Sequence, residues 1–244
     1  MNKELYRTED EYGPIIVLEQ GDKRTLSFGS DLQQTSLLMH KPQYLVHEYT
    51  QIMLLGLVFT DIRQITILGL GGGGLAHCLN YYYPQIVTRV VEIRQSVIDI
   101  AYQWFNLPQK ANLKVYNRDA REYIKRVKAQ SIDLLLSDLY EAQGMNELQA
   151  QTEFIEQSNK ALSDSGWMVI NFHQMPDKNS AVMKTIYQNF SDVRVCDVFI
   201  GNWILFCGKK ESAFDKNEIN ERVRKLAKKL GLPLMYYFKN LRKI

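Results

Sequence analysis

The sequence predicts an α/β protein with a mostly parallel sheet, helices on both of its faces and an antiparallel hairpin at its end. From residue 65 onward, apolar segments with the period of a strand alternate with segments that have the period of a helix. Two extended runs then surround Gly-Asn in "RVCDVFIGNWILFCG", which is the signal of a hairpin. This order of elements is typical of a Rossmann-like sheet that closes with a hairpin.

The elements before residue 65 are of a different kind. The runs "GPIIVLEQG" and "KRTLSFG" alternate in polarity and are separated by Gly-Asp and Gly-Ser turn signals, which predicts small antiparallel hairpins. Apolar residues then recur at helical spacing from Tyr44 to Phe59, which predicts a helix. We therefore divide the chain into a β-rich region, 1–43, and an α/β domain, 44–244.

The α/β domain contains the alternating elements. The expected strands are Ile65–Leu68, Val87–Glu92, Leu113–Tyr116, Ile132–Ser137 and Trp167–Phe172. The expected helices are Leu75–Tyr82, Gln95–Phe105, Ala120–Lys128 and Asn146–Leu162. Pro84 and Pro108 follow two of these helices, and proline is common just beyond a helix end.

The composition is that of an ordinary globular protein, with 45% apolar and 23% charged residues. No window of 18 uncharged apolar residues exists, so we expect no membrane span. The start "MNKELYRTEDEYG" lacks the apolar core of a signal peptide, which favours a cytoplasmic protein. The three cysteines are unclustered and are expected to be reduced thiols, and no Cys/His grouping has the spacing of a zinc site. We therefore expect no metal.

The net charge of +3 is small, and most of the positive excess lies in "ERVRKLAKKLGLPLMYYFKNLRKI". Such a stretch is more typical of a solvated helix face than of a nucleic-acid patch. We therefore expect no nucleic-acid partner.

Five glycines stand within six positions of the stretch "ILGLGGGG". Glycine inside an element costs about 0.5–1 kcal/mol relative to alanine, so the pattern suggests that something comes close to the backbone there. Gly69, Gly71 and Gly74 fit G-x-G-x-x-G, and their position between a strand and a helix strengthens a motif that is weak by itself. A tight turn alone is the other explanation.

Three acids follow at the ends of predicted strands. Glu92 lies about twenty residues beyond the glycines, where a carboxylate commonly binds both hydroxyls of a ribose, although a solvated charge is the alternative. Asp119 either contacts a ligand or caps the helix that begins at Ala120. Asp138 follows a largely apolar strand. Because desolvating a carboxylate is expensive, a charge at this position suggests a function. Together with the glycines, these acids predict a nucleoside-binding crevice.

In these motifs the sequence resembles the spermidine synthase (polyamine aminopropyltransferase) family. The resemblance rests on the ordered segments "ILGLGGGG", "VVEIR", "NRDAREYI" and "LLLSDLYEAQG", and on "LQQTS" near the N-terminus. It implies the class I S-adenosylmethionine-dependent methyltransferase-like fold, with 44–244 as the nucleoside-binding catalytic domain. The cofactor-binding residues that it implies are Gln34, Gly69, Gly71, Gly72, Gly73, Glu92, Asp119 and Ala120.

The resemblance further implies an enzyme that moves an aminopropyl group from decarboxylated S-adenosylmethionine to an amine such as putrescine, without a metal. Asp138 would accept a proton from the amine and orient its nitrogen, and Glu141 would hold the cationic substrate. The segment Leu139–Glu147 would act as a lid over the site. Members of the family commonly form dimers or tetramers, so a homodimer is expected.

The sequence departs from the family's pattern on the polyamine side. Gly72 stands where the family's loop carries an aspartate that grips the amine of the aminopropyl arm. The family's second catalytic-segment aspartate becomes Glu141, and its Tyr-Gln pair aligns with His47 and Glu48. We expect these two residues to contribute to substrate binding, although Glu48 is also explained as a surface charge on an amphipathic helix.

Other functions remain open on these residues. A methyltransferase that uses intact S-adenosylmethionine is favoured by Gly72, because a loop aspartate would repel the carboxylate of the methionine arm. An NAD-type oxidoreductase shares the glycines and Glu92 but predicts neither Asp119 nor the terminal hairpin. A descendant that binds a nucleoside without catalysis is a further alternative.

Overall fold

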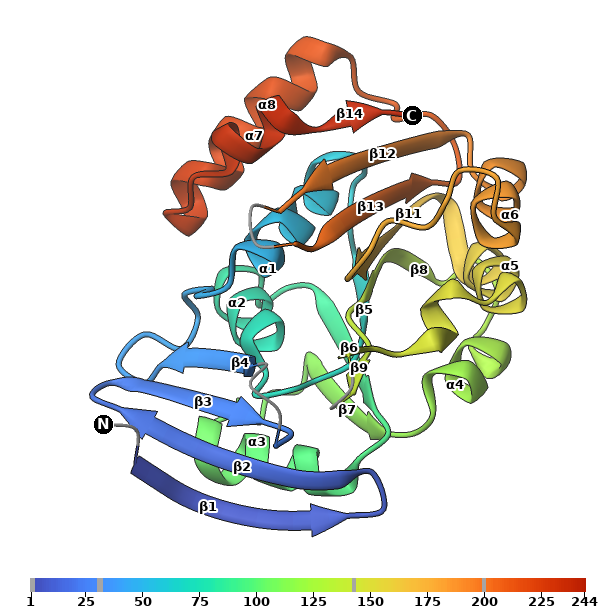
Figure 1. Ribbon diagram of the computed structural model, residues 1–244. Helices are drawn as coiled ribbons and strands as arrows, with labels where there is room; N and C mark the ends of the chain where they lie inside the picture. Colours follow the sequence, from blue (N-terminus) through green and yellow to red (C-terminus); the bar gives the residue numbers. More distant parts are fainter. Residues whose placement is uncertain (1–2, 30–32, 142–143, 199–200) are drawn as a thin grey trace.

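A computed structural model describes residues 3–29, 33–141, 144–198 and 201–244 of the chain. Its centre is an eight-stranded sheet with the order β14-β12-β13-β11-β8-β5-β6-β7 (Figure 1). The strands of this sheet are β5(Gln64–Leu68), β6(Val87–Glu92), β7(Leu113–Asn117), β8(Ile132–Ser137), β11(Leu162–Phe172), β12(Asp192–Asp197), β13(Trp203–Gly208) and β14(Arg242–Lys243). The run from β7 to β11 is parallel, and β13 pairs antiparallel with both β11 and β12. The predicted sheet with its terminal hairpin is confirmed.

The strand order reverses between β5 and β8. After β5 the chain proceeds outward to β6 and β7, whereas β8 lies on the other side of β5 and leads to β11. In sheets of this kind ligands bind at the carboxyl ends of the strands beside the reversal. The glycine-rich loop follows β5 and Asp138 follows β8, so the topology places both at this point.

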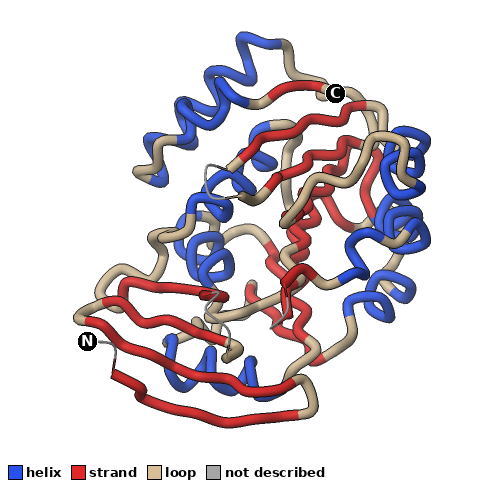
Figure 2. The backbone as a smooth tube through the Cα atoms, viewed as in Figure 1, coloured by secondary structure: helices blue, strands red, loops and turns tan. Residues whose placement is uncertain are grey.

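Helices cover both faces of the sheet, as Figure 1 and Figure 2 show. On one face lie α1(Glu48–Met53), the 3-10 helix η1(Leu54–Val58), α2(Gly74–Tyr82), α3(Gln95–Phe105), α7(Lys216–Leu230) and α8(Leu234–Asn240), and on the other lie α4(Ala120–Arg126), α5(Thr152–Ala161) and α6(Ala181–Asn189). Leu134 and Leu136 of β8 belong to the first hydrophobic core and Leu135 to the second, all three without solvent exposure. A parallel strand that is apolar throughout is therefore buried on both faces.

The N-terminal residues form an antiparallel sheet of β1(Lys3–Asp10), β2(Gly13–Gln20), β3(Lys23–Ser27) and β4(Gln33–Leu38) (Figure 1). Its inner residues Ile15, Val17 and Leu26 join the core on the α2 face of the large sheet. Arg94, just after β6, donates to Asp10 Oδ1 over 2.7 Å and to the Gly13 carbonyl over 2.6 Å. This contact holds the β1–β2 turn beside the carboxyl end of β6. The predicted hairpins are confirmed, and the division of the chain at residue 43 stays a prediction.

Two predicted helices differ from the structure. The helix expected from Tyr44 to Phe59 begins only at Glu48 and changes to a 3-10 helix at Leu54. At Gly56 an added Cβ would lie 2.8 Å from Val169 and 2.9 Å from Leu134, so the backbone there packs directly against the sheet. The apolar periodicity of this stretch reflects that burial and not one continuous helix.

The second difference concerns the helix expected over Asn146–Leu162. The structure has a short 3-10 helix η2(Glu147–Ala150) and then α5, which begins at Thr152. Leu162 belongs to β11 instead of the helix. Before η2, the strands β9(Tyr140–Glu141) and β10(Gly144–Met145) pair with each other. The predicted lid segment therefore contains a small hairpin, of which residues 142–143 lie outside the described residues.

The C-terminal basic stretch forms most of α7, then α8 and β14. The apolar residues Ile219, Val223 and Leu226 of α7 are buried, while its charged residues face solvent, as expected. Strand β14 extends the large sheet by pairing with β12, which the sequence did not predict. In the part of the chain that the structure describes, no helix is both long and apolar enough to cross a membrane. The three cysteines are buried free thiols.

Candidate functional site

A cleft of about 820 Å³ opens at the carboxyl ends of the parallel strands. Its walls come from the β1–β2 turn, the start of α1, the glycine-rich loop and the residues that follow β6, β7, β8 and β11. Glu92 and Asp138, the two acids with the most specific predicted roles, both line this one space. The topology therefore brings together residues that lie 46 positions apart in the sequence.

The glycine-rich loop turns between β5 and α2 in a left-handed backbone conformation. Gly69 has φ +92° and Gly71 has φ +53°, values that residues other than glycine rarely adopt. A Cβ at Gly69 would overlap the backbone oxygen of Asp138, and one at Gly71 would overlap Thr35 Oγ1. Both glycines line the cleft, so they allow the β5 and β8 loops to approach each other beside the ligand space.

The next two glycines have a different surrounding. Gly72 and Gly73 are not among the residues that line the cleft. A Cβ at Gly72 would lie 3.0 Å from the Phe105 ring, and one at Gly73 would lie 2.7 Å from Leu107. The Gly72 amide donates to Thr35 Oγ1 over 3.0 Å. These two glycines let the loop pack closely against Thr35, Phe105 and Leu107. Their contact with a cofactor stays a prediction.

Glu92 ends β6 and is held by the main chain. Its Oε2 accepts from the Leu70 amide and its Oε1 from the Arg94 amide, each over 3.0 Å. Burial raises the pKa of this carboxyl group, while the two amide donors oppose that rise. The side chain is only 9% exposed, yet it borders the cleft, so its remaining lone pairs face the ligand space. A carboxylate fixed in this way is suited to accept two neighbouring hydroxyl groups.

Asp119 follows β7 and caps α4. Its Oδ1 accepts from the Arg121 amide over 2.6 Å, so the capping explanation for this acid is confirmed. Asp119 and Ala120 also line the cleft on the side away from Asp138, where the predicted adenine contact would lie. The two roles are compatible because a carboxylate can accept several hydrogen bonds.

Asp138 lies directly after β8, half-buried at the centre of the cleft. Its Oδ1 accepts from Asn171 Nδ2 over 2.8 Å, and the Tyr49 hydroxyl donates to the same carboxyl group. Burial raises its pKa to about 6, against the effect of both hydrogen bonds. At neutral pH the group is therefore a carboxylate that is poised to accept a proton.

A network of polar side chains extends from Asp138 across the floor of the cleft. Asn171, near the end of β11, is fully buried, and its Oδ1 accepts from Asn202 Nδ2 over 2.8 Å. The same Nδ2 atom lies 3.0 Å from the Tyr140 hydroxyl oxygen. Burial and the nearby Asp138 raise the pKa of Tyr140, so this phenol stays neutral.

Three residues that line the cleft were not predicted from the sequence: Tyr49, Asn171 and Asn202. For Asn171 a signal was present, because an amide within the apolar run "WMVINF" must find partners when the strand is buried. Tyr49 and Asn202 carry no such signal. Tyr49 contacts Asp138 because α1 packs against the strand ends, and Asn202, just before β13, contacts Asn171.

Gln149 of η2 supports this floor from behind. It is fully buried, and its Oε1 accepts from Ser137 Oγ over 2.6 Å, while its Nε2 donates to the Leu139 and Asn171 carbonyls over 3.2 Å each. One amide thus ties the end of β8 to the end of β11.

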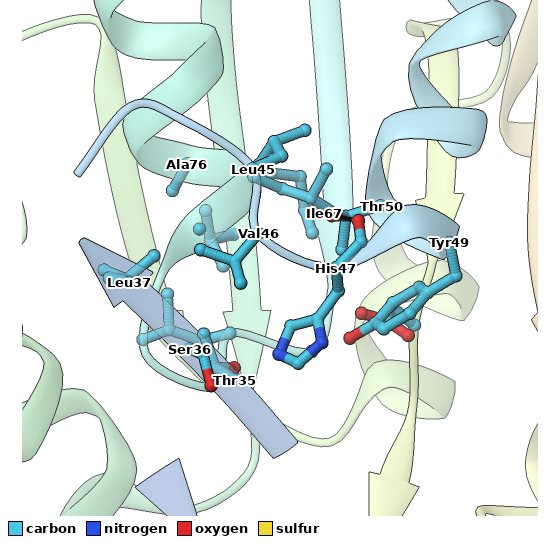
Figure 3. A pocket seen from close by; sticks show the side chains of 16 residues that line it. Thr35, Ser36, Leu37, Leu45, Val46, His47, Tyr49, Thr50, Ile67 and Ala76 are labelled. Atoms are coloured by element: carbon cyan, nitrogen blue, oxygen red, sulfur yellow. Dashed lines mark hydrogen bonds between the residues drawn. The ribbon is translucent and has the colours of Figure 1, made fainter. Parts of the chain in front are cut away.

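His47 precedes α1 and lies between the cleft and a narrow recess beside Gly69 and Asp138. Figure 3 shows its ring projecting towards Thr35 and Ser36 of β4, with the Tyr49 ring beside it, and the two ring centroids are 5.7 Å apart. Burial and the nearby Lys23 lower the pKa of His47 to about 4, so the ring is neutral. Its Nε2 atom is buried and has no hydrogen-bond partner among the described residues.

The other predicted binding residues occupy the rim. Glu48 begins α1 and lines the cleft, as does Glu141, which is exposed on β9 and accepts a hydrogen bond from Asn146 Nδ2. Gln34 lies in β4, but its side chain is outside the described residues. In the described part of the chain, no group of three histidine, cysteine or acidic residues is placed to hold a metal.

Comparisons with known proteins agree with this geometry. Residues 35–203 match the Spermine/spermidine synthase domain family. The chain is 33% identical to a polyamine aminopropyltransferase of Neisseria meningitidis serogroup A over 190 residues, which covers 77% of this chain and 68% of that protein. It is 30% identical to a polyamine aminopropyltransferase of Vibrio vulnificus over 201 residues, which covers 78% of this chain and 67% of that protein.

Solved structures show the same fold. A probable spermidine synthase from Corynebacterium glutamicum superposes with a TM-score of 0.77 at 22% identity, covering 98% of this chain and 89% of that one. Human methyltransferase-like protein 13 in complex with SAH superposes with a TM-score of 0.66 at 21% identity, covering 77% of this chain and 94% of that one. The match to the domain family and the identity to the bacterial relatives decide the classification: the chain belongs to the spermine/spermidine synthase family and is a transferase of the polyamine aminopropyltransferase family.

Proposed function

We propose that this protein transfers an aminopropyl group from decarboxylated S-adenosylmethionine to the nitrogen of a small amine such as putrescine. The observation that carries the proposal is that Glu92 and Asp138 line one cleft. Glu92 would bind the ribose hydroxyls, with Asp119 and Ala120 beside the base. The sulfonium and its neighbouring carbon would then lie towards Asp138.

The chemistry follows from the state of Asp138. A free polyamine nitrogen is protonated near pH 7, as a lysine side chain is, and cannot attack carbon in that form. The Asp138 carboxylate would accept the proton, and the neutral nitrogen would form a bond to the carbon next to the sulfonium. The carbon–sulfur bond would break with its electron pair on sulfur, and methylthioadenosine would leave. Alignment of nitrogen, carbon and sulfur in one cleft would supply much of the rate gain.

The acceptor end of the cleft supports an amine substrate. Glu48 and Glu141 lie on its rim and can pair with the ammonium group of an amine substrate, and the neutral His47 lines the same cleft. We propose substrate-binding roles for these three residues. A second cationic nitrogen, as in a diamine, would benefit from such acids at the rim.

The test is a product analysis with two donors. Purified protein is incubated with putrescine and either decarboxylated or intact S-adenosylmethionine, and the products are identified by mass spectrometry. Spermidine and methylthioadenosine from the decarboxylated donor are expected. Methylated amine and S-adenosylhomocysteine from the intact donor, without spermidine from the other, would overturn the proposal.

A methyltransferase that uses intact S-adenosylmethionine is the second candidate. Gly72 favours it, because the family's loop aspartate would repel a methionine carboxylate and glycine does not. Calorimetry with decarboxylated S-adenosylmethionine, S-adenosylmethionine and NAD separates the candidates, since preference for the decarboxylated donor supports aminopropyl transfer and preference for the carboxylated donor supports methyl transfer. Preference for NAD would overturn both.

A further inference from the structure

We propose that Asn202 is a positioning residue: through its hydrogen bond to Asn171 it fixes which end of the Asn171 amide faces Asp138, and it ties the β9–β10 hairpin to the same network. The proposal rests on the proposed function, in which Asp138 accepts the proton. Asn202 lies between β12 and β13, outside the sequence motifs that predicted the site.

Asp138 and Asn202 together determine the direction of the hydrogen bonds that the Asn171 amide makes. A carboxylate can only accept, so the Asn171 group 2.8 Å away from Asp138 Oδ1 must be the amide nitrogen. The Asn171 oxygen therefore points to Asn202 and needs a donor there. Asn202 Nδ2, at 2.8 Å, is that donor. If Asn171 turned over, its oxygen would face the carboxylate and both groups would be repelled.

The Tyr140 hydroxyl is the third member of this chain. Because Asn202 donates to it over 3.0 Å, the tyrosine oxygen is the acceptor and its own proton is left to point elsewhere. Tyr140 lines the cleft and belongs to β9, the first strand of the predicted lid. Asn202 thereby connects three elements that are distant in sequence, namely β9, β11 and the β12–β13 turn.

Among the described contacts of the Asn171 side chain, Asn202 is the group that orients its amide towards Asp138. Titratable side chains line the cleft with Asp138 from several elements: His47 just before α1, Tyr49 in α1, Glu92 at the end of β6, Tyr140 and Glu141 on β9, and His173 after β11. Tyr49 donates to Asp138 from the α1 side. On the β11 side the donor is Asn171, which is buried and takes its orientation from Asn202.

The proposal predicts the effect of Asn202→Ala on proton acceptance. Without its donor, Asn171 rotates more freely and stabilises the Asp138 carboxylate less, so the pKa of Asp138 rises. A rise of about one unit lowers turnover about fivefold at pH 6 and leaves it within about twofold at pH 8.5. A residue that only supports the fold would lower turnover by the same factor at every pH.

Carboxyl NMR of the whole protein measures this without any substrate. Aspartate is labelled with ¹³C at the side-chain carboxyl, Asp138 is assigned from Asp138→Asn, and its titration is followed in the wild type, Asn202→Ala, Asn171→Ala and the double variant. The matched control is Asn220→Ala, which removes a half-buried asparagine of α7 that does not line the cleft. It should leave the Asp138 titration unchanged.

The expected result is a higher Asp138 pKa in Asn202→Ala and in Asn171→Ala, with no further rise in the double variant, because Asn202 acts through Asn171. An unchanged pKa in Asn202→Ala, or shifts that add in the double variant, would overturn the proposal. If no donor gives turnover but the titrations behave as expected, the proposed function fails and the network stands.

Discussion

The two ends of the cleft are built in different ways. At the proposed nucleoside end, Glu92 is fixed by two backbone amides, and the glycine loop is shaped by its own backbone angles. At the acceptor end, Asp138 is held by side chains, Tyr49 from α1 and Asn171 from β11, and Asn171 in turn contacts Asn202. One end depends on the main chain of a local motif, and the other on side chains from separate elements.

This difference bears on where the sequence departs from the family's motifs. A site made by main-chain groups depends on the local backbone, which the glycine loop and the strand ends specify. A site made by side chains can be rebuilt by substituting them. His47 and Glu141 are departures on the proposed acceptor side, where such rebuilding is expected, whereas Gly72 lies in the glycine loop and does not line the cleft.

The largest effect is expected from Asp138→Asn, which tests the proposed acceptor end of the cleft. The variant removes the proton acceptor but preserves the shape of the side chain, so kcat should fall by about 10²–10⁴. Steady-state kinetics with the donor that proves active measures this effect. Turnover close to that of the wild type would contradict the role given to Asp138.

Substitution of Gly69 tests the main-chain character of the other end. Gly69→Ala should lower the free energy of unfolding by about 3 kcal/mol or more, because it combines a left-handed backbone with overlap on the Asp138 carbonyl. The matched control is Gly13→Ala, at φ +96° but with no atom within 4 Å of the added Cβ. It should cost about 1 kcal/mol. Denaturant unfolding of both variants compares them, and equal costs would show that the close approach carries no energy.

The pH profile of turnover is the third test. Burial raises the pKa of Asp138 to about 6, so kcat should fall as the pH drops through about 6. The raised pKa affects stability in the opposite direction to turnover. Because the folded state binds the proton more tightly than the unfolded chain, this group stabilises the fold at low pH. That stabilisation is lost as the pH rises through about 6. Asp138→Asn should therefore melt a few degrees higher than the wild type at pH 8, as thermal unfolding can measure. A profile that is flat between pH 5 and 7 would contradict this assignment.

The smallest effect is expected at the rim. Glu141 is exposed and already accepts a hydrogen bond from Asn146, so Glu141→Gln should raise KM for the amine about two- to fivefold without changing kcat. The increase should shrink at high salt, because an exposed charge is screened. A loss of kcat would mean that Glu141 takes part in the reaction itself.

Much of the fold could be predicted from the sequence because its signals are local. The strand β6 and the helix α3 were predicted with the bounds that the structure has, since strand and helix periods alternate there. The stretch from Tyr44 to Phe59 was wrong as one helix, because burial against the sheet produces the same apolar spacing. Strand β14 was missed, as a two-residue pairing leaves no pattern.

The site residues likewise differ in whether a local sequence signal marks them. Glu92 and Asp138 were predicted to share a site because each lies at the carboxyl end of a strand, and the topology brings such positions to one cleft. Asn202 could not be found, because its role depends on the direction of the Asn171 amide, which no sequence period encodes. Sequence signals therefore identify the motif-built end of the cleft better than the end built by side chains.

The central claim is that one ligand spans the cleft from Glu92 to Asp138. Calorimetric titration of decarboxylated S-adenosylmethionine into the wild type, Asp138→Asn and Glu92→Gln tests it most directly. We predict that Asp138→Asn binds within about threefold of the wild type, whereas Glu92→Gln weakens binding about 10- to 100-fold, the loss of a charge-assisted contact to the ligand. Unchanged binding by Glu92→Gln, or equal losses in both variants, would contradict the account.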